Sequence, residues 1–175
     1  MGGAAHLGRR VARARGRVRG RCPRVRVGSV ARLAWAGAAA DGPAGEWVLR
    51  RTVTDRLAGV DGSVIGTTTL TSTAADEVRW DESGTMTFDG RAVPVSRTLH
   101  VRRAADDRWT VFFADGRAFH DWVWGERVDH ACAPDDYAGV LAGDVDRWTV
   151  RWEAHGPAKD YVLDSELRRR SRTAD

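Results

Sequence analysis

The sequence has few cysteines and no long run of apolar residues. Of its two cysteines, Cys22 lies in an arginine-rich leader, so Cys132 has no partner for a disulfide in the rest of the chain. No C-x-x-C pair is present to bind zinc. A single cysteine of this kind is expected to be a buried apolar side chain in a reducing cytoplasm. No apolar stretch reaches the roughly 18–20 residues that a membrane-spanning helix requires. We therefore predict a cytoplasmic protein with no membrane span and no metal site.

Acidic residues are missing from the first 40 positions, which contain ten arginines. The rest of the chain holds the other 18 of the 28 basic side chains and all 24 acidic ones, so its net charge is −6, although the whole chain carries +4. The basic character thus belongs to the leader. It does not indicate a domain that binds nucleic acid.

Residues 1–44 are predicted to form a disordered basic leader and linker, because a block of like charge repels itself and offers few large apolar groups. Four interpretations remain open: an arm that touches nucleic acid, an organelle transit peptide, a tail without a role, and a start codon assigned too far upstream. The composition favours the last two. Residues 171–175 are predicted to be a tail, which leaves one domain over residues 45–170.

No segment has the pattern of a helix of three turns, whereas apolar residues recur with period two from Glu46 onward. In the first such stretch Trp47, Leu49 and Val53 share a face with Arg51. Further stretches of this kind, separated by turn residues, give nine or ten short strands. Sequential hairpins with short turns predict an all-β fold, an antiparallel up-and-down β-barrel wide enough for one small ligand.

Three local features refine the predicted strands. Gly66 interrupts a threonine-rich strand and indicates a possible bulge. Pro94 restricts its strand to an edge or a bulge near its start. The sequence DRWTV occurs at residues 107–111 and again at 146–150. We interpret the repeat as two separate strands that follow similar turns, because five residues are too few to indicate a duplication.

Four short motifs occur in order along the body of the chain. They are W-x-L-x-R (Trp47, Leu49, Arg51), D-G-R-x-F-H (Asp115, Gly116, Arg117, Phe119, His120), a looser set at His130, Cys132, Asp135 and Tyr137, and G-P-x-K-D-Y (Gly156, Pro157, Lys159, Asp160, Tyr161). Over roughly residues 45–170 the chain resembles an uncharacterised bacterial and fungal family that is known as a domain of unknown function. The resemblance implies a barrel of the lipocalin and calycin type, and it implies no activity.

Strand parity points an unusual number of polar side chains toward the interior. These are Arg51, Glu82, Arg97, His120, His130, Lys159 and Tyr161. An unpaired buried charge costs several kcal/mol, so each charge must meet a counter-charge, a water or a ligand. We predict that the barrel binds a small, anionic and partly planar molecule. Its acid group would contact the arginines and the lysine, and its flat part would stack on Trp80, Trp122 or Trp152.

The two histidines leave alternatives open. If Gly125 lies in a turn, His120 and His130 face one another across a hairpin. They are then structural, or they contact the ligand, or they act as acid and base with Tyr137 or Tyr161 in a small enzyme such as a lyase, isomerase or hydrolase. A haem-binding barrel is a further alternative, although no cofactor is predicted. Nucleic acid is not an expected partner of the barrel, and contact through the basic leader stays an open alternative. No pattern sets an oligomeric state.

Overall fold

The computed structural model describes residues 44–170, so the predicted leader (apart from Ala44) and the predicted tail lie outside the described residues. The described residues contain ten strands and no helix, which confirms the all-β prediction. The strands are β1 (Gly45–Asp55), β2 (Val60–Ala74), β3 (Glu77–Phe88), β4 (Arg91–Arg103), β5 (Trp109–Phe113), β6 (Ala118–Asp121), β7 (Arg127–Cys132), β8 (Asp135–Gly143), β9 (Arg147–Gly156) and β10 (Lys159–Arg169).

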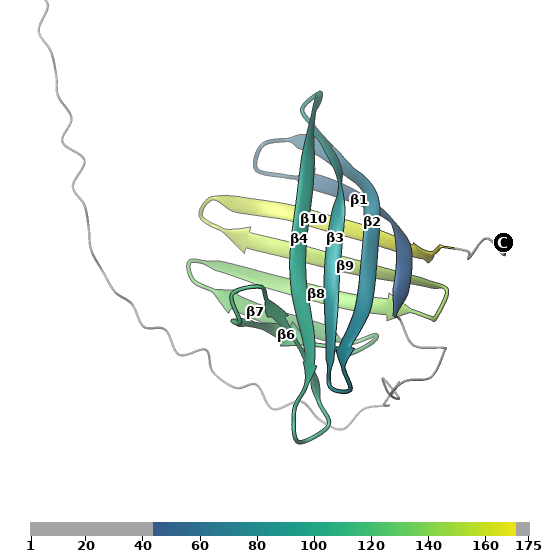
Figure 1. The fold of residues 1–175 in the computed structure, drawn as a ribbon. Helices are drawn as coiled ribbons and strands as arrows, with labels where there is room; N and C mark the ends of the chain where they lie inside the picture. Colours follow the sequence, from purple (N-terminus) through teal and green to yellow (C-terminus); the bar gives the residue numbers. More distant parts are fainter. Residues whose placement is uncertain (1–43, 171–175) are drawn as a thin grey trace, which may run out of the picture. The chain divides into compact units, whose positions relative to one another are not determined.

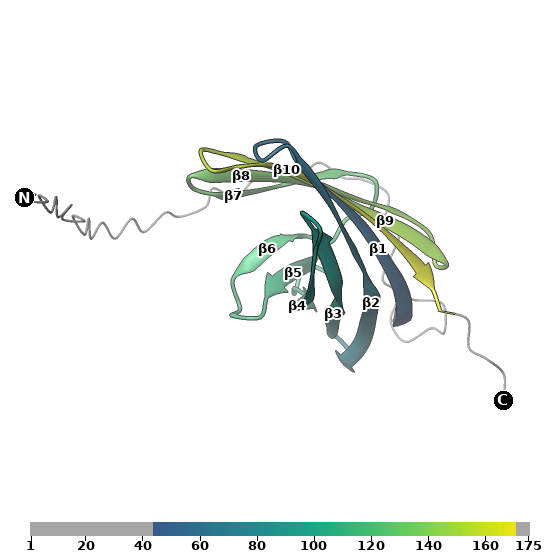
Figure 2. The ribbon, with the colours of Figure 1, turned by 90° about the horizontal axis from the view of Figure 1, so that it is seen from above.

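The strands form one antiparallel sheet in the order β6-β5-β4-β3-β2-β1-β10-β9-β8-β7. Each strand pairs with its neighbour in sequence except at β6 and β7, and β1 pairs with β10. The sheet folds back on itself, so that β2, β3 and β4 cross over β8, β9 and β10 (Figures 1 and 2). The predicted up-and-down barrel is therefore confirmed as a nearly closed barrel, with its seam between β6 and β7.

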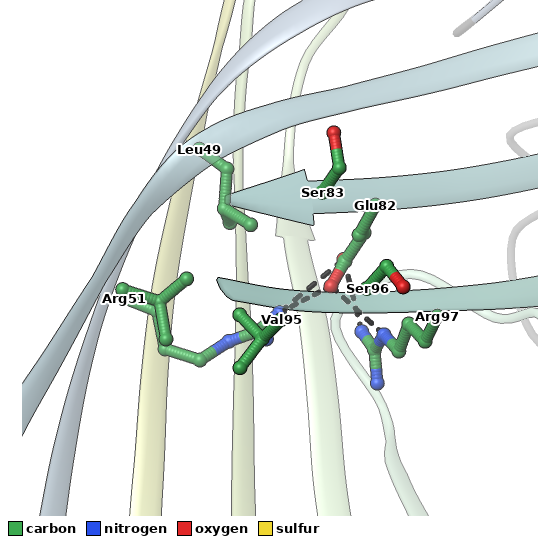
Figure 3. A pocket seen from close by; sticks show the side chains of 8 residues that line it. Leu49, Arg51, Glu82, Ser83, Val95, Ser96 and Arg97 are labelled. Atoms are coloured by element: carbon green, nitrogen blue, oxygen red, sulfur yellow. Dashed lines mark hydrogen bonds and ion pairs between the residues drawn. The ribbon is translucent and has the colours of Figure 1, made fainter. Parts of the chain in front are cut away.

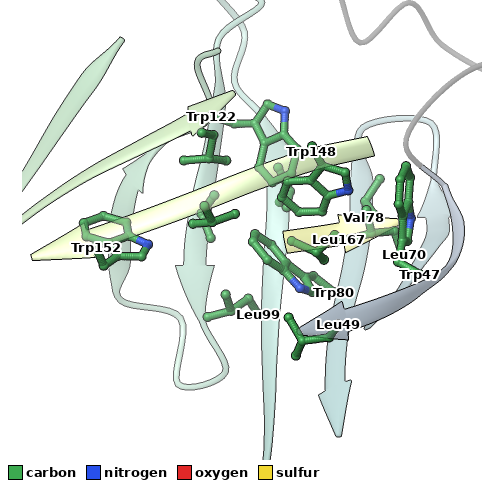
Figure 4. Packing of buried hydrophobic residues seen from close by; sticks show 14 of the residues in the cluster. Trp47, Leu49, Leu70, Val78, Trp80, Leu99, Trp122, Trp148, Trp152 and Leu167 are labelled. Atoms are coloured by element: carbon green, nitrogen blue, oxygen red, sulfur yellow. The ribbon is translucent and has the colours of Figure 1, made fainter. Parts of the chain in front are cut away.

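A cluster of tryptophans fills one part of the interior (Figure 4). Trp47, Trp80 and Trp148 are 0%, 1% and 0% exposed. Trp80 and Trp148 meet edge to face with 5.5 Å between ring centroids, and Trp122 packs on both of them. Aromatic pairs at these distances stabilise a core beyond their buried area. Because the rings occupy this part of the lumen, open space is confined to other parts.

The structure corrects one local prediction and confirms two others. Gly66 pairs with Gly84 without a register shift, and the bulge lies instead between Ser72 and Ala74. Pro94 lies on β4 before its pairing with β5 begins at Leu99, so this part of β4 is an edge as predicted. The two DRWTV repeats lead into separate strands, β5 and β9.

The predicted hairpin between the histidines is wrong. β6 ends at Asp121, and the segment that follows packs across β8: Trp124 forms a parallel bridge with Leu141, and Gly125 N donates to Leu141 O at 2.6 Å. A cross-strand ladder therefore does not form between β6 and β7. Cys132, predicted to be buried, is exposed, because β7 ends there in the turn to β8.

Within residues 44–170, no helix is long and apolar enough to cross a membrane.

Candidate functional site

A buried carboxylate shared by two arginines is the central polar feature of the interior. Glu82 on β3 is 5% exposed. Arg97 on β4 donates from Nε to Oε2 at 2.8 Å and from Nη2 to Oε1 at 2.9 Å. Arg51 on β1 donates from Nη2 to the two carboxylate oxygens at 3.2 and 2.9 Å (Figure 3). Trp80 Nε1 adds a bond to Oε1 at 3.2 Å. With five bonds accepted, the carboxylate is held as a fixed counter-ion.

Arg51 reaches Glu82 across the intervening strand β2. On β2 its register partner is Val64, whereas the β2 partner of Glu82 is Thr68. The inner-face residue between those two is Gly66, which has no side chain to obstruct the crossing. Arg51 Nε also donates to Ser165 Oγ on β10 at 2.7 Å. The guanidinium is therefore fixed from two sides of the barrel.

The site holds two cationic groups and one anionic group. Burial lowers the pKa of Arg51, and the charge of Arg97 lowers it further, although Glu82 opposes both effects. Burial alone would raise the pKa of Glu82, but the charges and hydrogen bonds of Arg97 and Arg51 hold that pKa below its usual value. Glu82 is therefore ionised, and its single negative charge faces two positively charged guanidinium groups.

Both arginines keep one nitrogen for further contacts. Within residues 44–170, no hydrogen bond or ion pair involves Nη1 of Arg51 or Nη1 of Arg97. The Arg97 side chain is 33% exposed, and its guanidinium lies 5.5 Å from the centre of the Trp80 ring. These donors lie beside a pocket of about 90 Å³. Its lining consists of Leu49, Arg51, Val64, Glu82, Ser83, Val95, Ser96 and Arg97.

A pair of glycines opens the space beside the arginines. Gly66 and Gly84 pair directly across β2 and β3, in the inner row that continues to Leu49 on β1 and Val95 on β4. A Cβ on Gly66 would lie 2.1 Å from Ser83 O on β3, and a Cβ on Gly84 would lie 2.5 Å from Ile65 O on β2. The backbones of β2 and β3 thus approach too closely at this point for either residue to carry a side chain. The absence of side chains here leaves room in the lumen.

Lys159 and Tyr161, both predicted ligand contacts, belong to a second polar cluster. Lys159 Nζ lies 2.7 Å from Asp135 Oδ2 and donates to Tyr137 Oη at 2.7 Å. Asp135 and Tyr137 raise the pKa of Lys159 above its usual value. Burial, with a further contribution from Tyr137, raises the pKa of Tyr161 to about 12. Both residues lie outside the lining of the pocket, so the structure does not join this cluster to the arginine site.

The two histidines also lie outside the pocket lining. His120 is 6% exposed, and its Nδ1 lies 2.8 Å from Asp121 O. Burial lowers the pKa of His120 to about 4, with contributions from Arg97 and His130, so the imidazole is neutral at pH 7. Burial also lowers the pKa of His130. His120 therefore donates through Nδ1, and its Nε2 is a hydrogen-bond acceptor.

The predicted acid–base arrangement does not assemble at the pocket. His130 and Tyr137 are register partners, but their ring centroids lie 6.1 Å apart. Within the described part of the chain, no hydrogen bond joins a histidine to a tyrosine. The haem alternative fits no better, because the pocket contains no histidine and, at about 90 Å³, is far smaller than a tetrapyrrole.

Comparison with known proteins assigns the chain to a family. The model described as "Family of unknown function (DUF6314)" matches residues 44–169. The chain belongs to this family. The resemblance seen in the sequence is thereby confirmed, and so is the barrel that it implied. No curated protein matches the chain.

The chain of this DUF6314 member aligns with solved structures. The S-type phycobiliprotein lyase CPES from Guillardia theta aligns with a TM-score of 0.50 and 14% identity, over 74% of this chain and 89% of the other. The redesigned β-barrel mFAP0, solved bound to DFHBI, aligns with a TM-score of 0.41 and 16% identity, over 72% and 97% of the two chains. At these identities the likeness concerns the fold alone.

In this DUF6314 barrel, other side chains cover the three tryptophans that were predicted to stack on a ligand. Trp80 and Trp122 are buried in the aromatic cluster. Trp152 is 6% exposed and stacks on Phe119, with centroids 4.7 Å apart and an interplanar angle of 18°. These three rings pack on other side chains of the protein, whereas the sequence predicted that one of them would stack on a ligand.

Sequence reasoning missed three contributors to the two polar clusters. Ser165 was overlooked because a serine on a strand carries no distinguishing pattern. The pairing of Gly66 with Gly84 depends on the register of β2 and β3, which the sequence does not show. Asp135 is 8% exposed and was recognised only within a motif. The sequence alone does not show that Asp135 lies beside the G-P-x-K turn, because that proximity depends on the pairing of β8 with β9.

Proposed function

We propose that this DUF6314 barrel binds a small organic anion in its interior and that Arg51 and Arg97 contact the acid group. The observation that carries the proposal is the buried carboxylate of Glu82, which fixes both arginines. Nη1 of each arginine nevertheless has no partner among residues 44–170, and both lie beside an open pocket. A guanidinium with free donors is suited to the oxygens of a carboxylate, sulfonate or phosphate.

The charge balance supports an anionic ligand over a neutral one. A purely structural network would be expected to neutralise itself, because buried charge is costly. Here one carboxylate faces two guanidinium groups, and the lowered pKa of Arg51 has burial as its main cause. The apolar side chains of Leu49, Val64 and Val95 complete the pocket and reduce local screening by water. An anion would supply the missing charge.

Binding is favoured over catalysis by the positions of the titratable groups. Glu82 is saturated with donors, and both histidines lie outside the pocket lining. The solved neighbour named as a lyase does not alter this choice, because a shared fold does not carry function. We propose the cytoplasm as the compartment, since Cys132 is a free, exposed cysteine.

Benzoate, a small planar carboxylate, is a direct probe of the proposal, and benzamide is its neutral counterpart. In an NMR titration of the ¹⁵N-labelled protein, benzoate should give saturable shifts of the Arg51 and Arg97 Nε–H signals and of the Trp80 indole signal. Benzamide should give none. The substitution Arg97→Gln should weaken benzoate binding by at least about tenfold, the size expected for one lost charge-assisted contact.

Arg50→Gln is the matched control, because Arg50 is the exposed neighbour of Arg51 and the substitution removes the same charge. It should leave the benzoate dissociation constant unchanged. Equal binding of benzoate and benzamide, or equal weakening by the two substitutions, would show that the arginine site does not recognise anions.

A further inference from the structure

The inner face beyond the arginine site is apolar and open. Strand parity places Arg51, Glu82 and Arg97 on this face. From them toward the β1–β2 and β3–β4 hairpins the inner positions are glycine or apolar, as far as the charged residues Asp55 at the end of β1 and Arg91 at the start of β4. We call five of these residues the apolar wall: Val53 on β1, Met86 and Phe88 on β3, and Val93 and Val95 on β4.

The exposure of the wall sets it apart from the rest of the inner face. On the same faces of β3 and β4, Val78 and Leu99 are 1% and 3% exposed. In contrast, Val93 is 42% exposed, and the other residues of the wall are partly exposed. Figure 1 shows the β3–β4 hairpin projecting at one end of the barrel. Apolar surface that faces inward and remains open indicates a ligand more strongly than scattered outer residues do.

The wall is continuous with the pocket. Val95 lines the pocket, and Val93 is the next inner-face residue on β4. Met86 pairs with both Val93 and Val64, which also lines the pocket. Phe88 lies over Gly62, since a Cβ there would come within 2.6 Å of its ring. Phe88 lies four positions after Gly84 on β3, so the wall extends about 13 Å from the pocket along the strand.

The pocket is large enough for only one part of a ligand. A pocket of about 90 Å³ holds an acid group and little more, whereas small-molecule sites typically measure roughly 300–1,000 Å³. The remainder of a ligand anchored at Arg97 must leave the pocket. The adjoining inner surface that it meets is the apolar wall.

We infer that the ligand is an amphipathic acid whose acid group contacts Arg51 and Arg97 and whose apolar chain lies along the apolar wall. This inference rests on the proposed function and adds the chemical class of the ligand. An apolar protein segment is a weaker candidate for the wall, because the wall begins at two arginines whose Nη1 donors have no partner in the described part of the chain. A terminal acid group complements that charge.

Straight-chain carboxylates from acetate to decanoate, kept below their micelle concentrations, test the inference by calorimetric titration of the full-length protein. Each added methylene that reaches the wall should tighten binding by about two- to fourfold, where fourfold corresponds to complete burial. The gain should level off once the chain exceeds the length of the wall. Val93→Thr keeps the side-chain shape but replaces a methyl group with a hydroxyl, so it should reduce the gain per methylene.

The matched control is Ile65→Thr, which makes the same type of change on the outer face of β2, where Ile65 is 60% exposed. It should leave all dissociation constants unchanged. Arg97→Gln should weaken every acid by a similar factor and preserve the gain per methylene. If binding depends on Arg97 but not on chain length, the wall is not the site of the chain, although the proposed function stands. If acids and the corresponding alcohols bind equally, the proposed function fails, whatever the effect of chain length.

Discussion

Glu82 is a buried carboxylate that remains ionised and yet has no free lone pair for proton transfer. Burial favours its neutral form, but two guanidinium groups within 2.9 Å reverse this preference. The indole of Trp80 occupies a further acceptor position. The residue therefore orients Arg51 and Arg97, and it cannot act as a general base while they are bound to it.

Glu82→Gln should destabilise the fold by about 3–5 kcal/mol, the usual cost of removing one partner from a buried ion pair. The physical reason is that two guanidinium groups would remain together without a counter-ion. Urea unfolding at pH 7 measures the loss. Asp81→Asn removes a charge from the adjacent outward-facing residue, whose side chain is 36% exposed, and should cost less than about 1 kcal/mol. Similar losses in the two variants would contradict the counter-ion role.

Strand parity was sufficient to predict that Arg51, Glu82 and Arg97 lie on the inner face, because their apolar neighbours alternate with period two. It could not predict that both arginines share one carboxylate. Arg51 and Glu82 lie two strands apart, and their contact depends on the missing side chain at Gly66. Parity also failed at Cys132, because a strand that enters a turn no longer alternates between inside and outside.

The pairing of β2 with β3 depends on the two glycines that face each other. Close approach of the strands at Gly66 and Gly84 brings each Cα within 3 Å of where the other's Cβ would lie. Because these two positions have no side chains, space remains for the pocket and for the Arg51 side chain to reach β3. A glycine in a strand pattern is compatible with either a bulge or a close backbone approach, and the sequence alone did not distinguish the two.

Gly66→Ala should cost about 3 kcal/mol and should also weaken benzoate binding. The added Cβ would lie 2.1 Å from Ser83 O, so backbone atoms must move, and Arg51 loses its route over β2. Gly59→Ala is the control: Gly59 has φ +67° and no atom within 4 Å of the added Cβ. It should cost about 1 kcal/mol from backbone strain alone and leave binding unchanged. Thermal unfolding and the benzoate titration measure both effects. An equal cost at the two positions would contradict the close-approach explanation.

Closure of the barrel is asymmetric. The first and last strands are joined by a full ladder, whereas β6 and β7 are not paired in the sheet. A side-chain contact spans the seam: the rings of His130 and Phe119 lie 5.1 Å apart, edge to face. The sequence predicted the meander but placed a hairpin at this point, because it could not show that the segment after Asp121 packs across β8 instead.

A seam without a ladder should be the first part of the barrel to open, because its backbone amides lack the cooperative protection of paired strands. We expect amide hydrogens on β6 and β7 to exchange at least about tenfold faster than those on β1, β2 and β3, measured by hydrogen–deuterium exchange with NMR or mass spectrometry. His130→Ala removes the ring contact with Phe119 and should accelerate exchange on β6 and β7 further, with β1–β3 unaffected. His155→Ala removes a histidine whose side chain is 54% exposed and should leave the seam unchanged. Uniform exchange across all the strands, or acceleration that spreads evenly through the barrel in His130→Ala, would mean that the seam opens only when the whole fold unfolds.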